Sequence, residues 1–559
     1  MTHPWLKNYE EGVPTEAEIP EIALYEILDR SAAKYPQNIA VSFMGAGITY
    51  PRLAELANSF AAALAGMGVK KGDRVAIHLP NCPQFLIAYF GTLKLGAIIV
   101  PCNPLYVERE MVSQLNNSGA EVIITLSRFY PLIAKIRTNT KLRHIIVTNI
   151  KEFFPGKLKV LFTLFKEKKD GHRVEVSKDG ATHLLPDLLK KYSGGKAPAV
   201  TIDPAEDLAV FMYTGGTTGV PKGAMLTHRN LLGNACQTKT WFTQMREGKE
   251  VILTVLPLFH SYAMTTCLNL GIMTGATLIL LPQFILKDVL DTIQSQKPTL
   301  FPGVPTMYVA INNYPEINKY DLTSISACIS GAAGLPLEVQ IKFEELSGGK
   351  LVEGYGLSEA SPVTHANPIA GKRKPGSIGL PFPSTLAKVV SLEDESDLPV
   401  GEVGELAVKG PQVMKGYWQN DEETAQMLRG EWLFTGDMAK MDEDGYFYIV
   451  DRKKDMIIAG GYNIYPREVE EVLYTHPKVQ EVVVASVPDA HRGETVKAYC
   501  VLKEGEEATP EEIIEFCKDK MAKYKLPTQV EFRTVLPKSM IGKILRRVLV
   551  EEERNKAKQ

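Results

Sequence analysis

The chain has 559 residues, more than a single hydrophobic core organises, so two or more domains are expected. Hydrophobic residues make up 45% and charged residues 23% of the sequence, which is typical of a globular protein and excludes a disordered or fibrous chain. The 63 lysines and arginines nearly balance 65 aspartates and glutamates, and this net charge of −2 gives no general reason to bind nucleic acid.

The cysteines and the N-terminus point to a cytoplasmic protein. Seven cysteines are scattered singly, with no CxxC pair, as expected for buried free thiols in a reducing compartment. The first residues lack a basic segment followed by an apolar run, so no export signal is expected.

Buried strands alternate with helices in the first 150 residues. The apolar runs predict strands over 73–80, 96–104, 120–126 and 142–149, and a helix over 83–95. Alternation of this kind predicts an α/β fold with doubly wound, mostly parallel sheets.

The segment from Lys157 to Lys169, KLKVLFTLFKEKK, predicts a basic amphipathic helix. Its apolar residues at helical spacing are Leu158, Leu161, Phe162 and Phe165, with lysines around them. Such a helix could lie on an anionic bilayer, or it could pack on the surface of its own domain. The sequence leaves both interpretations open.

A glycine- and threonine-rich loop, YTGGTTGVPKG at 213–223, follows a predicted strand at 208–212. Its glycines allow successive N–H groups to point at an anion, and Lys222 adds a positive charge. It is not the common P-loop, because Lys222 lies between Pro221 and Gly223 rather than before Ser or Thr. Taken alone, the loop is equally consistent with an ordinary turn.

The stretch 251–286 contains no Asp, Glu, Lys or Arg. Prolines, glycines and polar residues interrupt it, so we expect a buried strand at 251–256, a helix near 262–273 and a strand at 276–281, not a membrane span. From about residue 375 short alternating strands predict a small β-barrel or distorted sheet. After 451–455 a compact α+β domain is expected, with helices at 467–475 and 510–524 and strands at 481–487 and 496–502.

The loop at 213–230 resembles the AMP-binding signature of the adenylate-forming superfamily. Further motifs of that superfamily follow in order: PLFHSYA (257–263), SGAA (330–333), EGYGLSEASP (353–362), WLFTGD (432–437), DRKKDMIIAGGYNIYP (451–466) and PKSMIGKILRR (537–547). Within it, the chain is most similar to bacterial long-chain fatty acid–CoA ligases. The resemblance implies a large AMP- and acyl-binding domain at 1–452, which includes a β-barrel-like part at about 376–450, and a small mobile lid at 453–559.

The implied reaction joins a fatty acid to CoA at the expense of ATP. The carboxylate attacks the α-phosphate of ATP, pyrophosphate leaves, and CoA then cleaves the acyl-adenylate. ATP, Mg²⁺ and CoA are therefore expected. An aryl-CoA ligase, a carrier-loading adenylation enzyme and a luciferase-like oxygenase share the motifs, and a non-catalytic nucleotide-binding or membrane-scaffold protein is disfavoured because Glu359, Asp437 and Lys543 are all present.

The resemblance also assigns roles to individual residues. Those expected to bind ATP or AMP are Tyr213, Thr214, Gly215, Gly216, Thr217, Thr218, Gly219, Lys222, Gly331, Ala332, Tyr355, Gly356, Ser358, Asp437 and Arg452. Those expected to serve catalysis are Lys222, His260, Glu359 and Lys543, with Glu359 also binding Mg²⁺. Lys454 is expected at the hinge between the domains and Gly461 beside the pantetheine arm of CoA.

Each assignment has a simpler alternative. His260 could be a hydrogen-bonded core histidine, Glu359 a solvated glutamate, and Lys543 part of a basic surface with Arg546 and Arg547. The uncharged stretch 251–286 could line an acyl channel or form a plain buried sheet. Peripheral contact with the inner face of the cell membrane and a homodimer are left open.

Overall fold

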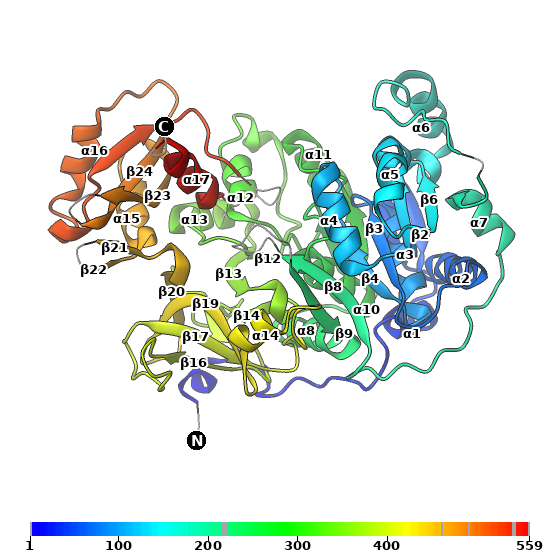
Figure 1. Cartoon of the computed structure of the whole chain (residues 1–559), viewed down its shortest axis with the longest axis horizontal. Coiled ribbons are helices and arrows are strands. Elements are labelled where there is room, and N and C mark those ends of the chain that lie inside the picture. The colour runs from blue at the N-terminus through cyan, green and yellow to red at the C-terminus, as the bar shows by residue number, and fades with distance from the viewer. Residues whose placement is uncertain are drawn as a thin grey trace. The chain divides into compact units, whose positions relative to one another are not determined.

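The computed structural model describes residues 3–177, 179–214, 222–459, 462–489, 492–538 and 544–556 (Figure 1). Contacts divide the chain into two compact units. The N-terminal unit comprises Asn8–Leu386 and Lys409–Glu431, and the C-terminal unit comprises Ala387–Val408, Trp432–Gln559 and Met1–Lys7. The expected boundary near Lys454 stays a prediction.

A seven-stranded sheet organises the first half of the N-terminal unit. Its order is β7 (Thr182–Leu184), β6 (His144–Thr148), β5 (Val122–Leu126), β3 (Arg74–His78), β4 (Ile98–Pro101), β8 (Leu208–Thr214) and β9 (Lys222–Thr227). The recorded pairings are parallel up to β8, and β9 then returns antiparallel to it. The strands and the helix predicted for this region are confirmed within a few residues.

Burial explains why these strands form. All five positions of β5 are buried, and so are all four of β4, as expected for parallel strands covered on both faces. The connecting helix α3 (Pro83–Lys94) starts with proline at its first position, where the missing N–H costs nothing, and every one of its residues is buried. The alternation in the sequence thus follows the layers of the fold.

Two smaller sheets complete the N-terminal unit. One has the order β10 (Val251–Thr254), β11 (Thr277–Leu280), β1 (Ile39–Phe43) and β2 (Ala46–Thr49). The other has the order β12 (Ala327–Ser330), β13 (Lys350–Gly356), β14 (Val363–Ala366) and β15 (Leu380–Pro381). The uncharged stretch supplies β10, β11 and a continuous helical segment, α9–η6–α10 (Ser261–Met273), as predicted.

The other helices of this unit are α1 (Glu26–Lys34), α2 (Tyr50–Gly66), α4 (Glu108–Ser118), α5 (Tyr130–Ile136), α6 (Gly156–Leu161), α7 (Leu185–Lys191), α8 (His228–Trp241), α11 (Leu286–Gln296), α12 (Pro305–Asn312), α13 (Leu337–Ser347) and α14 (Asp421–Met427). Within the described residues no helix is long and apolar enough to cross a membrane.

The C-terminal unit contains two sheets. The first includes β16 (Leu386–Val390), β17 (Gly404–Lys409), β19 (Trp432–Met441) and β20 (Phe447–Arg452). The second has the order β22 (Tyr462–Ile464), β21 (Ile457–Ala459), β24 (Gly493–Leu502) and β23 (Val479–Asp489), with β25 (Gln529–Phe532) parallel to β24. Its helices are α15 (Pro466–Tyr474), α16 (Pro510–Cys517) and α17 (Arg546–Lys556).

Two predicted helices differ in detail from those observed. The helix expected at 510–524 ends at Cys517, because the next three residues, Lys518 to Lys520, are exposed and offer no apolar side chain for burial. The basic segment continues α6 as a π-helical turn, η5 (Phe162–Lys166), in which the Glu167 N–H donates to the Phe162 carbonyl.

The wider π turn changes which side chains are buried in this segment. Phe162 faces inward, where its ring packs against Phe154 and His172. The predicted partners Leu161 and Phe165 are instead exposed, so the expectation of a single face containing Leu161, Phe162 and Phe165 was wrong. All seven cysteines are free and buried, as predicted.

Candidate active site

The β8–β9 hairpin carries the start and the end of the glycine-rich loop. Thr214 is the last residue of β8 and is directly opposite Lys222, the first residue of β9. The predicted site residues Gly215, Gly216, Thr217, Thr218 and Gly219 lie outside the described residues. The Tyr213 hydroxyl donates to Asn117 Oδ1 of α4 at 2.5 Å, so this side chain is held by α4. Burial raises the pKa of Tyr213, which therefore stays protonated.

The second part of the candidate site is the turn after β12. A Cβ on Gly331 would lie 3.1 Å from the ring of Tyr262, tighter than most side chains allow, so only glycine fits without displacing this ring. The Tyr262 hydroxyl donates to the Ile329 carbonyl at 2.7 Å and fixes the ring. Ala332 has a left-handed backbone, with φ of 68°, which costs energy in a residue other than glycine.

The PLFHSYA motif contacts the EGYGLSEASP motif directly. Ser261 Oγ lies 3.2 Å from Ser358 Oγ, although the two residues are far apart in the sequence. His260 is half-buried at the start of α9, where its Nδ1 accepts from the Tyr262 N–H at 3.4 Å. The structure thus brings His260, Ser261 and Ser358 into one region, and the role of His260 stays a prediction.

Strand β13 places the next set of predicted residues. Tyr355 lies opposite His365 of β14, and their ring centroids are 6.0 Å apart. Burial lowers the pKa of His365 to about 3, so a neutral ring packs against the tyrosine. At Gly356 a Cβ would lie 2.1 Å from the Pro362 carbonyl oxygen, so glycine is required here for steric reasons.

Glu359 is buried, with 8% of its surface exposed, in the short helix η8 (Ser358–Ala360). The Tyr417 hydroxyl donates to Glu359 Oε1 at 2.7 Å. The alternative of a solvated glutamate is therefore wrong for this protein. Its role in Mg²⁺ binding stays a prediction.

Two residues that the sequence did not single out complete this region. Tyr417 contacts Glu359, and Glu423 of α14 forms an ion pair with Lys222. Tyr417 lies in the stretch KGYW at 415–418, and nothing in the sequence pattern there points to Glu359. Only the folded chain shows that these pairs meet.

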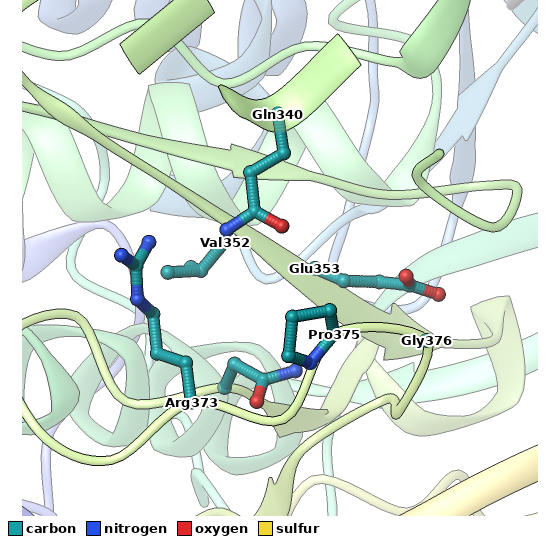
Figure 2. A pocket seen from close by; sticks show the side chains of 7 residues that line it. Gln340, Val352, Glu353, Arg373, Pro375 and Gly376 are labelled. Atoms are coloured by element: carbon teal, nitrogen blue, oxygen red, sulfur yellow. The ribbon is translucent and has the colours of Figure 1, made fainter. Parts of the chain in front are cut away.

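A small hollow lies beside β13, at the start of the EGYGLSEASP motif (Figure 2). Its described lining residues are Gln340, Val352, Glu353, Asn367, Arg373, Pro375 and Gly376, and none of these is a predicted site residue. Glu353 accepts from the Leu335 N–H at 3.1 Å, and Arg373 is ion-paired with Glu344. The Glu353–Leu335 hydrogen bond ties β13 to the end of the turn that carries Gly331 and Ala332.

Asp437 and Arg452 meet in the C-terminal unit. They are opposite each other in the antiparallel pair β19–β20, and Arg452 Nε lies 3.3 Å from Asp437 Oδ1. Asp437 is 7% exposed, and its backbone follows Gly436, whose φ of 71° suits glycine. The two predicted ribose contacts are therefore neighbours, and the contact with ribose itself stays a prediction.

The expected hinge lies directly after β20. Lys454 is in the short helix η9 (Lys453–Asp455), where burial, followed by the positive charge of Arg452, lowers its pKa. Gly461 and Lys543 lie outside the described residues. Arg546, considered as part of a plain basic surface, is instead half-buried and forms ion pairs with Asp451, Asp455 and Glu470.

Glu359 is the residue that the resemblance assigns to Mg²⁺, and its surroundings can be compared with that assignment. In the part of the chain that is described, no three His, Cys, Asp or Glu side chains cluster as they would in a metal cage. Mg²⁺ commonly takes one carboxylate together with phosphate oxygens, and a buried carboxylate at Glu359 fits that chemistry.

Comparisons with known proteins agree with this geometry. A family model described as AMP-binding enzyme matches residues 28–418, and one described as AMP-binding enzyme C-terminal domain matches 468–543. The chain is 50% identical over 550 residues to a long-chain-fatty-acid–CoA ligase of Bacillus subtilis, covering 98% of each chain. It is 40% identical over 568 residues to a ligase of the same name from Escherichia coli O6:H1, covering 100% of this chain and 99% of that one.

A solved structure shares the fold over nearly the whole length. The anthranilate CoA ligase AuaEII, in complex with anthranoyl-AMP, matches with a TM-score of 0.84 at 29% identity, covering 96% of this chain and 98% of that one. On the family models and the full-length relatives together, the chain belongs to the family of AMP-binding enzymes.

Proposed function

We propose that this protein is an AMP-forming long-chain-fatty-acid–CoA ligase. The observation that carries the proposal is the 50% identity, over 98% of both chains, to a relative with that name. In the N-terminal unit, the buried Glu359 and Lys222 at the end of the loop support binding of phosphate and Mg²⁺. In the C-terminal unit, the Asp437–Arg452 pair offers groups that suit a ribose. A fold shared with an aryl-CoA ligase leaves the choice of acid to experiment.

The first step of the proposed reaction forms an acyl-adenylate. A carboxylate oxygen of the fatty acid attacks the α-phosphorus of ATP, and the bond to the bridging oxygen breaks as pyrophosphate leaves. Both reactants are anions, so the site must hold them together and stabilise the charge that develops on the phosphate. Lys222 and Lys543 are proposed to supply positive charge, with Lys222 on the β- and γ-phosphates and Lys543 on the α-phosphate.

The second step transfers the acyl group to CoA. The CoA thiol gives up its proton, its sulfur attacks the acyl carbon, and the bond to the phosphate oxygen breaks, so that acyl-CoA and AMP are released. A rotation near Lys454 is proposed to replace Lys543 by the segment 459–463, which contains Gly461, between the steps. Because the resemblance places the hinge near Lys454, we also propose that the boundary between the two domains lies between residues 452 and 453.

Mg²⁺ is proposed to be held by Glu359 together with phosphate oxygens of ATP. When bound, the ion neutralises phosphate charge and orients the leaving pyrophosphate. The remaining groups are the chain's own: Thr214 and Ser358 contact phosphate, and Tyr355 stacks on adenine beside Gly331 and Ala332.

The test is AMP formation from ATP with acetate, octanoate, palmitate, oleate or 4-coumarate, each with and without CoA. CoA-dependent turnover that favours palmitate or oleate supports the proposal. A preference for 4-coumarate would make the chain an aryl-CoA ligase, and accumulation of acyl-AMP that ignores CoA would make it a carrier-loading enzyme. Light scattering measures the mass of the protein in solution and tests separately whether it forms a homodimer.

We also propose that α6–η5 touches the inner face of the cell membrane, where fatty acids partition. Figure 1 shows α6 at the periphery of the N-terminal unit. Four large apolar side chains there are 53–72% exposed: Val160, Leu161, Leu164 and Phe165. Five exposed lysines surround them: Lys157, Lys159, Lys166, Lys168 and Lys169. An apolar surface with a basic rim complements an anionic bilayer.

The helix is well anchored beneath this surface, as a docking element must be. Phe162 is buried, and Lys151 forms an ion pair with Glu167 at 2.6 Å. We therefore expect Lys168→Glu together with Lys169→Glu to lower binding to phosphatidylglycerol vesicles roughly tenfold or more, since each lysine contributes about 1 kcal/mol near an anionic surface.

The matched control is Lys190→Glu with Lys191→Glu in the last turn of α7, where the same charges are reversed on another exposed helix. This control should bind vesicles far better than the α6–η5 variant. An equal loss in both variants, or no loss in either, would contradict the membrane proposal. Turnover of octanoate in solution should be unchanged in both.

A further inference from the structure

The segment that contains Tyr417 is fixed to the strand that begins at Lys222. The Met225 N–H donates to the Gly416 carbonyl at 2.8 Å, and the Lys415 N–H donates to the Met225 carbonyl at 3.0 Å. The Trp418 N–H donates to the Gly223 carbonyl at 2.8 Å. Backbone hydrogen bonds on both sides of Tyr417 therefore set its position relative to β9.

The Tyr417 side chain points from this segment at Glu359. The tyrosine is 3% exposed and the glutamate 8%, and the hydroxyl donates to Glu359 Oε1 at 2.7 Å. The Met414 N–H donates to the backbone carbonyl of Glu359 at 2.8 Å, so the same segment holds both the backbone and the carboxylate.

The hydroxyl is a dependable donor in this place. A tyrosine hydroxyl carries a hydrogen that it can donate, whereas an ionised carboxylate can only accept, so the Tyr417–Glu359 contact has Tyr417 as its donor. A hydrogen bond to a charged acceptor of this kind is stronger than a neutral one.

We infer that Tyr417 is a positioning residue that orients the Glu359 carboxylate toward the Mg²⁺ of bound Mg·ATP. One carboxylate oxygen is occupied by the Tyr417 hydroxyl, so the other is presented to the cation. Hydrogen-bonding partners of metal-binding carboxylates fix the ligand's direction, and their loss commonly weakens metal binding about 10–100-fold. The inference rests on the proposed function, since it assumes that Glu359 meets a nucleotide-bound cation.

The experiment measures the binding of fluorescently labelled ATP, without fatty acid or CoA, as Mg²⁺ is titrated. Tyr417→Phe removes the hydroxyl and keeps the ring. We expect the Mg²⁺ concentration for half-maximal binding to rise about tenfold or more, while binding in EDTA stays within about twofold of the unsubstituted protein. A merely structural role would weaken binding equally with Mg²⁺ and with EDTA.

The matched control is Tyr50→Phe. Tyr50 is also fully buried, and its hydroxyl donates to the Ala276 carbonyl at 2.6 Å, but it contacts none of the predicted site residues that are described. This variant should show the Mg²⁺ dependence of the unsubstituted protein. The inference is overturned if Tyr417→Phe does the same, or if its binding in EDTA falls as much as its binding with Mg²⁺.

A second variant tests the Tyr417–Glu359 contact by changing the glutamate. Glu359→Asp keeps the carboxylate but withdraws it from the Tyr417 hydroxyl, so it should raise the Mg²⁺ requirement by itself. Adding Tyr417→Phe should then change little, because the contact is already lost, and additive shifts would overturn the inference. If the unsubstituted protein binds no labelled ATP, the proposed function fails; if it binds ATP without regard to Mg²⁺, the inference alone fails.

Discussion

Arg546 is the residue whose replacement should disturb the C-terminal unit most. Its Nη1 lies 2.9 Å from Asp455 Oδ2 and 3.3 Å from Asp451 Oδ1, and its Nη2 lies 2.8 Å from Glu470 Oε1. The Arg546 side chain is 17% exposed, that of Asp451 4% and that of Glu470 14%. One guanidinium therefore compensates three poorly hydrated carboxylates.

Arg546→Met keeps most of the volume of this side chain and removes its charge. Removing one partner of a buried ion pair typically costs about 3–5 kcal/mol, because the remaining charges are left without compensation. For a unit of this size, each kcal/mol lowers the unfolding temperature by about 2–4 °C. We therefore expect calorimetry at pH 8 to show the transition of the C-terminal unit lowered by roughly 10 °C.

The pH dependence gives a second test of the same reasoning. Burial raises the pKa of Asp451, and the positive charge of Arg546 opposes this rise. Without Arg546 the pKa of Asp451 rises further above its unfolded value, so the folded variant binds a proton more tightly than the unfolded chain does. Stability is then regained as the pH falls through the folded pKa, and the gap between variant and unsubstituted protein should narrow from pH 8 to pH 5.

Arg547→Met is the matched control, because Arg547 is 56% exposed and its Nε lies 3.6 Å from Glu551. We expect a change within about 0.5 kcal/mol, as for other exposed pairs. The reasoning is refuted if Arg546→Met unfolds as Arg547→Met does, or if its deficit is the same at pH 5 and pH 8. Combining Arg546→Met with Glu470→Gln should recover part of the loss.

Three further predictions concern the N-terminal unit. Glu423→Gln removes the ion pair with Lys222, so the Lys222 ammonium becomes available to phosphate. We expect labelled ATP to bind about threefold to tenfold more tightly, which corresponds to roughly 1 kcal/mol. Equal or weaker binding would show that Glu423 does not compete with ATP. Gly356→Ala forces a Cβ to 2.1 Å from the Pro362 carbonyl oxygen and should lower the free energy of unfolding by about 1–3 kcal/mol, as measured by thermal unfolding. Gly376→Ala is the control for backbone strain alone, because Gly376 has open space around it and a φ of 79°. Burial lowers the pKa of His78 to about 4, so as the pH falls the histidine takes up a proton in the unfolded chain before it does so in the folded protein. The free energy of unfolding, measured with urea, should therefore decrease from pH 6.5 towards pH 4, and His78→Gln should make this decrease smaller.

The pattern of apolar residues predicted the layers of the fold, because buried strands and helices show this pattern in their own local sequence. Strands β3, β5 and β6 and helix α3 lie within a few residues of their predicted bounds, since each is buried along its whole length or on one face. The amphipathic segment shows the limit of that reasoning. The structure buries Phe162 but leaves Leu161 and Phe165 exposed, and the π-helical turn at Phe162–Lys166 rotates Phe165 away from Phe162.

Contacts between polar or charged side chains that are far apart in the sequence could not be predicted from the sequence. Lys222 and Glu359 could be proposed from their motifs, but not their partners Glu423 and Tyr417. Tyr417 is brought to its place by the pairing of residues 415–418 with β9. The same limit applied to Arg546, where basic neighbours in the sequence suggested an exposed surface. Which side chains neutralise a charge depends on tertiary packing, and no local pattern records it.

The Arg546 contacts also bear on the hinge proposed at Lys454. Asp451 precedes Lys454 and Asp455 follows it, yet both carboxylates contact the same nitrogen, Nη1 of Arg546. Asp451 additionally accepts from the Arg467 N–H at 2.7 Å, at the start of α15. A change of backbone torsion angles at Lys454 moves Asp451 relative to Asp455, Arg467 and Arg546, so it cannot preserve all of these contacts. The proposed rotation therefore has to break at least one of these contacts, and a buried Asp451 then needs a new partner.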